Sequence, residues 1–303
     1  MAGDEPLAGT AMSAARYVFI SWPKGFWARK QFESQHFPPS LSDFLRTLER
    51  EKRVSTRLAH QHGIDSSERS QIFIMPDGIK YCDVPSDNIE NVLRDYFDGT
   101  ADREHQRVAT KGMCIFCCTH GKRDNCCAKF GQAVVHELRR EAIKRRLDLE
   151  VWECTHLGSD RFSASAVAFP YGYMYGRMRV ENVPDILDYL EKGYPYPPCY
   201  RGRLGLDSIE QIAQAFGHSY WFERQIENSE VVVNYASETA PNAAEASVTI
   251  VDGDSQVINA SFVLKLKKLE FQTYKDCGGV NGGEMKSVSR WVVSDSRLIT
   301  TLI

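Results

Sequence analysis

The sequence predicts an α/β protein of the α+β kind, in which two similar copies of one folding unit are followed by a C-terminal module. Three observations predict this. A Pro-Gly motif recurs with equal spacing in two places, each motif is preceded by a strand-helix-strand pattern, and the residues after 200 contain one helical stretch followed by several β-rich segments. Helices and strands that alternate in this way form mixed layers around a common core.

The internal repeat is carried by two Pro-x-Gly-x-x-Tyr motifs, at 76–81 and 170–175. In both copies a closing glycine, Gly99 or Gly193, lies 23 residues after the proline. Each motif predicts a hairpin, and the residues that follow it have apolar positions spaced for an amphipathic helix. The glycine suits a left-handed helix C-cap. The equal spacing favours duplication over chance similarity.

The residues before each hairpin extend the repeat. In the first copy, expected over 17–108, "RYVFISW" predicts a strand, "SLSDFLRTLEREKR" a helix and "VSTRLAHQ" a second strand. In the second copy, expected over 109–200, "KGMCIFC", "KFGQAVVHELRREAIKRRL" and "LEVWECT" follow in the same order. The order β-α-β and then β-β-α is that of the thioredoxin-like fold, so we predict tandem thioredoxin-like domains. Residues 1–16 are expected to be a flexible leader.

The third region, 201–303, is predicted to be an α+β module. The stretch "DSIEQIAQAFGHSYW" predicts a helix, and Asp207 and Glu210 have capping-box spacing at its start. Four β-rich segments follow, with a hairpin signal at Asp252-Gly253. The stretch 237–246, "SETAPNAAEA", is expected to be a flexible loop. No chemistry is assigned to this module.

The composition is that of an ordinary globular protein, with 43% hydrophobic residues, 25% charged residues and a net charge of −3. This balance gives no overall attraction to nucleic acid or to an anionic membrane. The sequence contains no apolar run long enough to span a bilayer, and its start lacks the features of a secretory signal. We therefore expect a cytoplasmic protein without a membrane or nucleic-acid partner. The oligomeric state is not indicated.

The nine cysteines are concentrated in one place, because five of them lie within 114–127. An odd, clustered set is a poor disulfide framework, and in a reducing compartment it favours metal or redox chemistry. The second copy has "CCTHGKRDNCC" after its opening strand, whereas the first copy has "SWPKGFWARK" there. The first copy is therefore expected to be degenerate and the second to carry the chemistry.

Two pairs of residues in the second copy are candidate ligands. Cys118 and Cys127 lie in a loop between a strand and a helix, and the helix N-terminus should make Cys127 prone to form a thiolate. His156 and Asp160 lie four residues apart after "VWECT", across a turn, so both can face one point. His120, between the cysteines, is expected at the surface.

At these residues the chain resembles the sucrase/ferredoxin-like family, which are thioredoxin-like ferredoxin relatives and include the fungal actin-patches-distal proteins. The matching pieces are "FISWPKGFW", "CTHGKRDNCC", "VWECTHLGSDRF", "FPYGYMYGRM" and "YRGRLGL". The resemblance implies a 2Fe–2S cluster, which characterised relatives hold through C-x8-C and H-x3-H. Carried over, Cys118, Cys127 and His156 take three ligand positions. Asp160 stands in place of the second histidine, so the fourth ligand is open, with Cys126 and Cys154 as alternatives.

The favoured hypothesis is a 2Fe–2S electron-transfer or redox-sensing protein that exchanges electrons with a redox partner protein and is not itself an enzyme. One alternative is a thiol-disulfide oxidoreductase that uses the neighbouring cysteines. Another is a structural zinc module with Cys118, Cys127, His156 and a fourth ligand. The sequence contains no dinucleotide fingerprint, P-loop, serine nucleophile elbow or H-E-x-x-H motif that would indicate another enzyme class.

Overall fold

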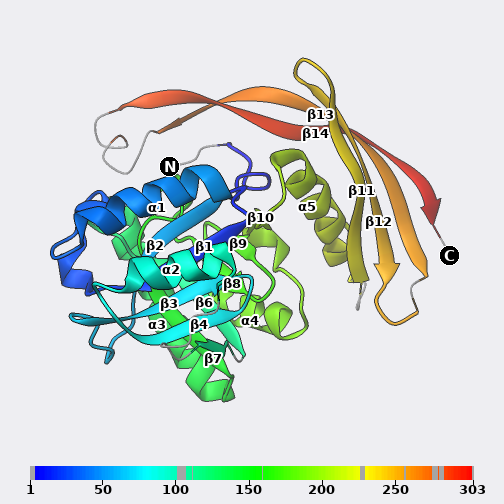
Figure 1. Ribbon diagram of the computed structural model, residues 1–303. Coiled ribbons are helices and arrows are strands. Elements are labelled where there is room, and N and C mark those ends of the chain that lie inside the picture. The colour runs from blue at the N-terminus through cyan, green and yellow to red at the C-terminus, as the bar shows by residue number, and fades with distance from the viewer. Residues whose placement is uncertain are drawn as a thin grey trace. The chain divides into compact units, whose positions relative to one another are not determined.

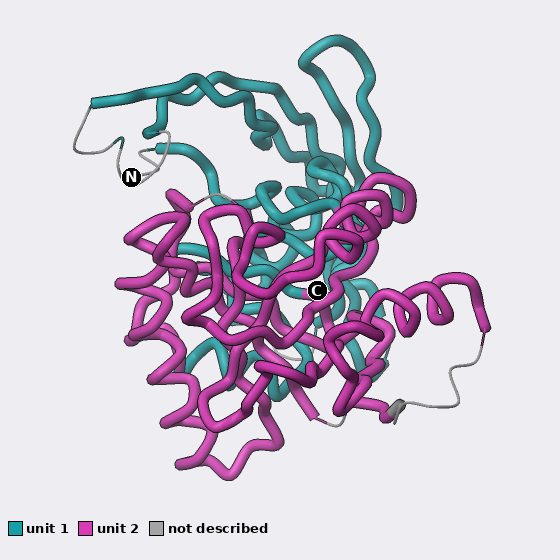
Figure 2. Tube along the Cα trace, turned by 60° about the vertical axis from the view of Figure 1, so that its left-hand side comes forward, with its two compact units in different colours: residues 1–13, 173–177, 184–303 teal, residues 14–172, 178–183 magenta. Residues whose placement is uncertain are grey.

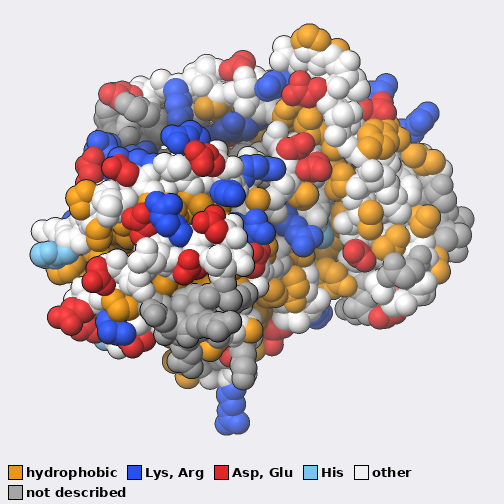
Figure 3. Space-filling view, in the orientation of Figure 1, with side chains coloured by type: hydrophobic (Ala, Val, Ile, Leu, Met, Phe, Trp, Pro, Cys, Tyr) orange, Lys and Arg blue, Asp and Glu red, His pale blue; other side chains and the backbone are white. Residues whose placement is uncertain are grey.

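The computed structural model describes residues 4–100, 107–110, 112–158, 160–225, 229–255, 257–274, 279 and 283–301. The chain forms two compact units (Figure 2). One comprises 14–172 and 178–183, and the other comprises 1–13, 173–177 and 184–303. On the face shown in Figure 3, acidic and basic side chains are interspersed. Among the described helices, none has both the length and the apolar content that a membrane crossing requires.

The first copy contains the predicted elements in the predicted order. They are β1 (Arg16–Ser21), α1 (Pro39–Lys52), β2 (Val54–His60), β3 (Arg69–Met75), β4 (Ile79–Pro85) and α2 (Ile89–Asp98). Two short 3-10 helices, η1 (Lys24–Phe26) and η2 (Gln31–Glu33), lie between β1 and α1, and β5 (Arg107–Ala109) follows α2. As predicted, α2 ends at Gly99 in the left-handed conformation, with φ of 75°.

The second copy repeats this order along the chain. Its elements are β6 (Met113–Cys118), α3 (Asn125–Arg145), β7 (Leu149–Cys154), η3 (Asp160–Phe162), β8 (Ala166–Phe169), β9 (Tyr173–Tyr175), η4 (Val180–Asn182) and α4 (Val183–Glu191). The short η5 (Pro197–Cys199) and β10 (Tyr200–Arg203) follow. The predicted α+β class, with tandem thioredoxin-like element order, is confirmed.

Within the unit built on 14–172, the strands form one sheet in the order β8-β6-β7-β2-β1-β3-β4-β5. In each copy the first two strands are parallel, and the next strand is antiparallel to the first. The copies join where β2 pairs antiparallel with β7, through Ala59–Cys154 and His60–Glu153. The sheet therefore places the C-terminal end of β7 directly beside the first copy.

Strand β1 is buried on both faces, which explains why apolar and polar residues do not alternate along it. Val18 and Ile20 belong to the core that includes Leu45 of α1 and Leu93 of α2. These two helices lie side by side (Figure 1). On the opposite face, Phe19 stacks on Phe116 of β6, with ring centroids 3.6 Å apart and planes inclined by 6°. A strand that is covered on both faces needs apolar residues at consecutive positions. Aromatic rings from both copies thus meet there, and Phe73 of β3 also packs against Phe116 and against Trp152 of β7.

The described residues of the C-terminal module form the helix α5 (Ser208–Glu223) and an antiparallel sheet in the order β11-β12-β13-β14. The strands are β11 (Ser229–Ala240), β12 (Ala243–Asp252), β13 (Ile258–Tyr274) and β14 (Met285–Thr301). The predicted capping box is present, because the Asp207 carboxylate accepts from the Glu210 N–H at 2.9 Å and Glu210 accepts from the Asp207 N–H at 2.8 Å.

One expectation for this module is wrong. Residues 237–246 are not a flexible loop, because they form the ends of β11 and β12 and the tight turn between them. The turn uses Asn242 with a positive φ of 61°. Residues 237–242 are exposed, and the buried positions of β12 in this stretch are alanines, Ala244 and Ala246. Alanine is too small to give a clear apolar alternation, so the hairpin gives no hydrophobic signal.

Candidate metal centre

The two candidate cysteines are held by regular backbone structure. Cys118 is the last residue of β6, and its N–H donates to the carbonyl of Ser165 at 2.9 Å. Cys127 lies in the first turn of α3, whose N-cap Asp124 accepts from the Cys126 N–H at 2.8 Å. The two cysteines are only 1% and 2% exposed. The loop between them thus closes over a buried pair of sulfurs.

The structure brings His156 to these sulfurs. Two residues beyond the end of β7, it contributes a ring nitrogen that lies within 4.8 Å of Sγ of Cys118 and Sγ of Cys127, as these do of each other. The register of the sheet explains this, because Cys118 pairs with Cys154 across β6 and β7. Parallel neighbouring strands end at the same edge, so the segments that follow them meet there. Two sulfurs and one imidazole nitrogen are a metal-ligand set.

Charge in this group is shared differently from our expectation. The thiol of Cys127 donates to Cys118, which, with a hydrogen bond to His156, lowers the pKa of Cys118 well below its usual range despite burial. Donation to Cys118 and burial raise the pKa of Cys127 instead. The hydrogen bond between the sulfurs thus lowers the pKa of Cys118 and raises that of Cys127, the reverse of the order expected from the helix terminus.

Asp160 lies beside the group of three but is not a member of it. Its Oδ1 is 2.6 Å from Nδ1 of His156 and 3.6 Å from Sγ of Cys127, and its Oδ2 is 3.9 Å from Nε of Arg123. Burial raises the pKa of Asp160, but the bond to His156 and the two positive charges lower it by more. Burial lowers the pKa of His156, and Asp160 and Cys118 more than offset this. The site therefore contains an ionised carboxylate against its imidazole.

The two alternative fourth ligands do not join this group. Cys154 is fully buried at the end of β7, and burial raises the pKa of its thiol well above the usual range, as expected for a packed apolar side chain. Cys126 is disulfide-bonded, which our sequence analysis does not predict. Seven other cysteines have free thiols: Cys82, Cys114, Cys117, Cys118, Cys127, Cys154 and Cys199. Cys277 lies outside the described residues.

Two residues near the site were missed by sequence reasoning. His120 is not at the surface: it is 2% exposed, and its ring packs edge-on against Trp27. Glu153, which precedes Cys154, is buried and pairs with Lys24 of the first copy and with the hydroxyl of Thr119. The one sequence feature related to both residues is the segment "SWPKGFWARK". It contains Lys24 and Trp27, and in the first copy it takes the place of the cysteine loop.

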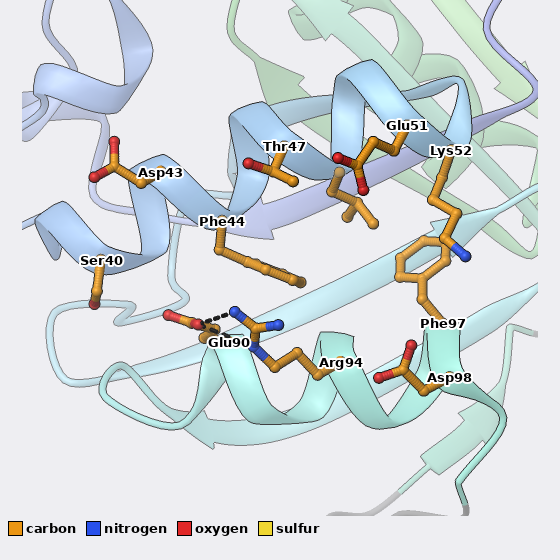
Figure 4. Close-up of a pocket in the computed structure, with 11 residues that line it drawn as sticks. Ser40, Asp43, Phe44, Thr47, Glu51, Lys52, Glu90, Arg94, Phe97 and Asp98 are labelled. Carbon is orange, nitrogen blue, oxygen red and sulfur yellow. Dashed lines mark hydrogen bonds and ion pairs between the residues drawn. The ribbon is translucent and has the colours of Figure 1, made fainter.

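A separate cleft of about 380 Å³ lies between α1 and α2 (Figure 4). Its lining includes Phe44 and Phe97, and Arg94 lies over the Phe44 ring and pairs with Glu90 at 2.7 Å. No cysteine or histidine lines it. This cleft therefore does not belong to the metal centre.

A comparison with protein families agrees with the resemblance in the sequence. The family model described as sucrase/ferredoxin-like matches residues 7–202. Among solved structures, a thioredoxin-like [2Fe-2S] ferredoxin from Aquifex aeolicus is similar at 15% identity and a TM-score of 0.28, over 31% of this chain and 94% of that one. Another structure of the wild-type ferredoxin gives 16% identity and a TM-score of 0.27, over 30% and 97% of the two chains. No curated protein matches the chain.

Proposed function

The chain belongs to the sucrase/ferredoxin-like family, and we propose that it is an electron-transfer or redox-sensing protein whose second copy holds a 2Fe–2S cluster. One observation carries the proposal: two buried thiol sulfurs and an imidazole nitrogen, from segments far apart in the sequence, lie within 4.8 Å of one another. Cys118, Cys127 and His156 are the proposed ligands. When bound, a cluster of this kind takes up and releases an electron.

The donor types suit such a cluster. Thiolates are soft ligands that favour iron–sulfur centres, and imidazole also binds iron. Replacing a thiolate with a neutral imidazole leaves less negative charge at the metal and raises the reduction potential. The Cys118 sulfur already has its pKa lowered by its neighbours. Deprotonating Cys118 therefore costs little free energy when it binds a cation.

We assign Asp160 to the fourth position. Two donors of one tetrahedral metal atom, at about 2.3 Å for sulfur and 2.1 Å for oxygen, lie about 3.6 Å apart. Oδ1 of Asp160 and Sγ of Cys127 are 3.6 Å apart. The same oxygen accepts from Nδ1 of His156, and this bond keeps both side chains at the site. A carboxylate is a harder ligand than imidazole and favours the ferric state.

The burial of both cysteines argues against thiol–disulfide exchange. An exchanging cysteine must be attacked by, or attack, a sulfur of another protein, so it needs a partly exposed sulfur. Cys118 and Cys127 are 1% and 2% exposed, whereas the His156 side chain is 25% exposed. The imidazole edge is thus the part of the centre that a redox partner protein can reach. We propose that electrons pass through this edge.

A second candidate is a mononuclear zinc site with the same residues. The compact spacing favours it, because donors that share one ion lie closer together than donors divided between two iron atoms. The two candidates predict different metal contents and colours. Zinc has no redox chemistry, so this site would be structural.

The test is reconstitution of metal-free protein, in parallel with ferrous iron plus sulfide and with zinc, followed by metal analysis and visible spectra. Cys118→Ser and His156→Ala should lose bound metal. The matched control is Cys82→Ser. This cysteine has a free thiol in the same unit, but it lies on β4, away from the site, so the variant should bind as much metal as the wild type. Equal metal binding by all four proteins would refute the proposed ligands.

A further inference from the structure

The segment 24–31 of the first copy, named the brace below, occupies a distinctive place. It follows β1, as the cysteine loop follows β6, and both precede the first helix of their copy. It contains no cysteine. It contacts both of the loops that carry the proposed ligands.

The brace contacts the first ligand loop, 118–127, at three points. Nε2 of His120 is 2.9 Å from the carbonyl of Ala28, and Nζ of Lys122 donates to the carbonyl of Gly25 at 3.1 Å. Trp27 packs against the imidazole with ring centroids 5.8 Å apart. Because a carbonyl only accepts, Nε2 of His120 carries the hydrogen. The backbone N–H of His120 donates to the Cys118 sulfur, so only His120 lies between the brace and that ligand.

The brace contacts the second ligand loop, 153–160, from its two ends. Lys24 pairs with the buried carboxylate of Glu153, which also accepts from the Thr119 hydroxyl of the first loop at 2.7 Å. At the other end, Oε1 of Gln31 accepts from the hydroxyl of Thr155 at 2.5 Å. Thr155 directly precedes His156. The brace therefore contacts the first ligand loop through the Trp27 ring and two backbone carbonyls, and the second through Lys24 and Gln31.

The brace itself is fixed by bonds within the first copy. The Trp27 indole N–H donates to the carbonyl of Trp22 at 3.2 Å, and the Ala28 N–H donates to the hydroxyl of Ser34 at 3.1 Å. Gln31 also donates to the carbonyl of Thr56 in β2 at 2.7 Å. Trp27 is almost completely buried. Because these bonds already order the brace, it loses no further conformational freedom when the ligand loops bind metal.

We propose that the brace is a positioning device that keeps both ligand loops in their binding geometry and so slows release of the bound metal or cluster. This rests on the proposed metal centre. Binding costs less free energy when the ligands are already ordered, because less conformational freedom is lost. The first copy, which lacks the cysteine loop, thus has a function of its own: it holds the ligand loops of the second copy in place.

The test compares two lysines of the same segment. Lys24→Met removes the bond to Glu153, whereas Lys30→Met, the matched control, removes only an exposed pair with Glu33. Gln31→Ala is a second brace variant, in case an unpaired Glu153 impairs folding. On loaded protein, a chelator should remove metal about tenfold faster from Lys24→Met and Gln31→Ala, equivalent to about 1.4 kcal/mol. Lys30→Met should match the wild type.

A second measurement does not need metal. In the metal-free protein, both brace variants should show faster alkylation of Cys118 and Cys127 and faster hydrogen exchange in the ligand loops, with far-ultraviolet circular dichroism unchanged. Wild-type rates in both brace variants, in both measurements, would overturn the brace. A wild-type protein that binds no metal would instead overturn the proposed function, and the alkylation and exchange rates would still test the brace.

Discussion

The close approach of α3 to β6 at Gly131 makes a sharp prediction. A Cβ at Gly131 would lie 2.1 Å from the carbonyl oxygen of Cys118, whereas ordinary contact begins at 3.4 Å. Gly131→Ala therefore requires the helix and the strand to separate by about 1.3 Å, the difference between these distances. Because Cys127 is in the same helix, it should move away from Cys118.

The expected cost follows from two opposing effects. Overpacking a close contact costs about 1–3 kcal/mol, with backbone atoms at the upper end because they cannot change rotamer. Replacing glycine by alanine within a helix stabilises the folded protein by about 1 kcal/mol. The Gly131→Ala variant should thus lose about 2 kcal/mol of unfolding free energy in urea titrations and release metal faster.

The matched control is Gly25→Ala, where an added Cβ meets nothing within 4 Å. This variant should unfold with the free energy of the wild type. If Gly131→Ala proves as stable as the wild type or more stable, the contact does not constrain the helix and the reasoning fails.

Three other predictions concern single residues. Burial lowers the pKa of His218 to about 3, below the unfolded value of about 6.5; stability should therefore fall as pH drops from 6.5 towards 3, by up to about 1.4 kcal/mol per pH unit. His218→Gln should lack this part of the slope in urea titrations across that range, and equal slopes would contradict the burial. Asp207→Ala should lower the unfolding free energy by about 1 kcal/mol through loss of the α5 cap, and no change would refute the capping role. Asp160→His should raise the reduction potential in redox titration of reconstituted protein, and an unchanged potential would remove Asp160 from the ligands.

The parts of the fold that the sequence predicts well are those with local signals. The Pro-Gly hairpins, the spacing of apolar residues in the helices and the capping box at Asp207 each depend on a few neighbouring residues. The approach of His156 to the cysteines also follows from the sequence, because two parallel strands of one repeat must end at the same edge. The element order therefore comes from pattern, whereas the choice of Cys118, Cys127 and His156 as a ligand set depends on the resemblance to the family.

The features that the sequence does not reveal depend on packing between the copies. His120 is buried because Trp27 and the carbonyl of Ala28 cover it, and those residues lie in the other copy. Glu153 remains charged in a buried position because Lys24 reaches it. The distribution of charge between Cys118 and Cys127 depends on which sulfur donates, which no spacing rule determines.

Iron and acid-labile sulfide, counted per chain in protein purified without oxygen, test the central proposal most directly. The account predicts two irons and two sulfides in each chain that has Cys118, Cys127 and His156 intact, and visible absorption that dithionite bleaches. One zinc ion per chain without sulfide, or a colourless protein free of any metal, would contradict it.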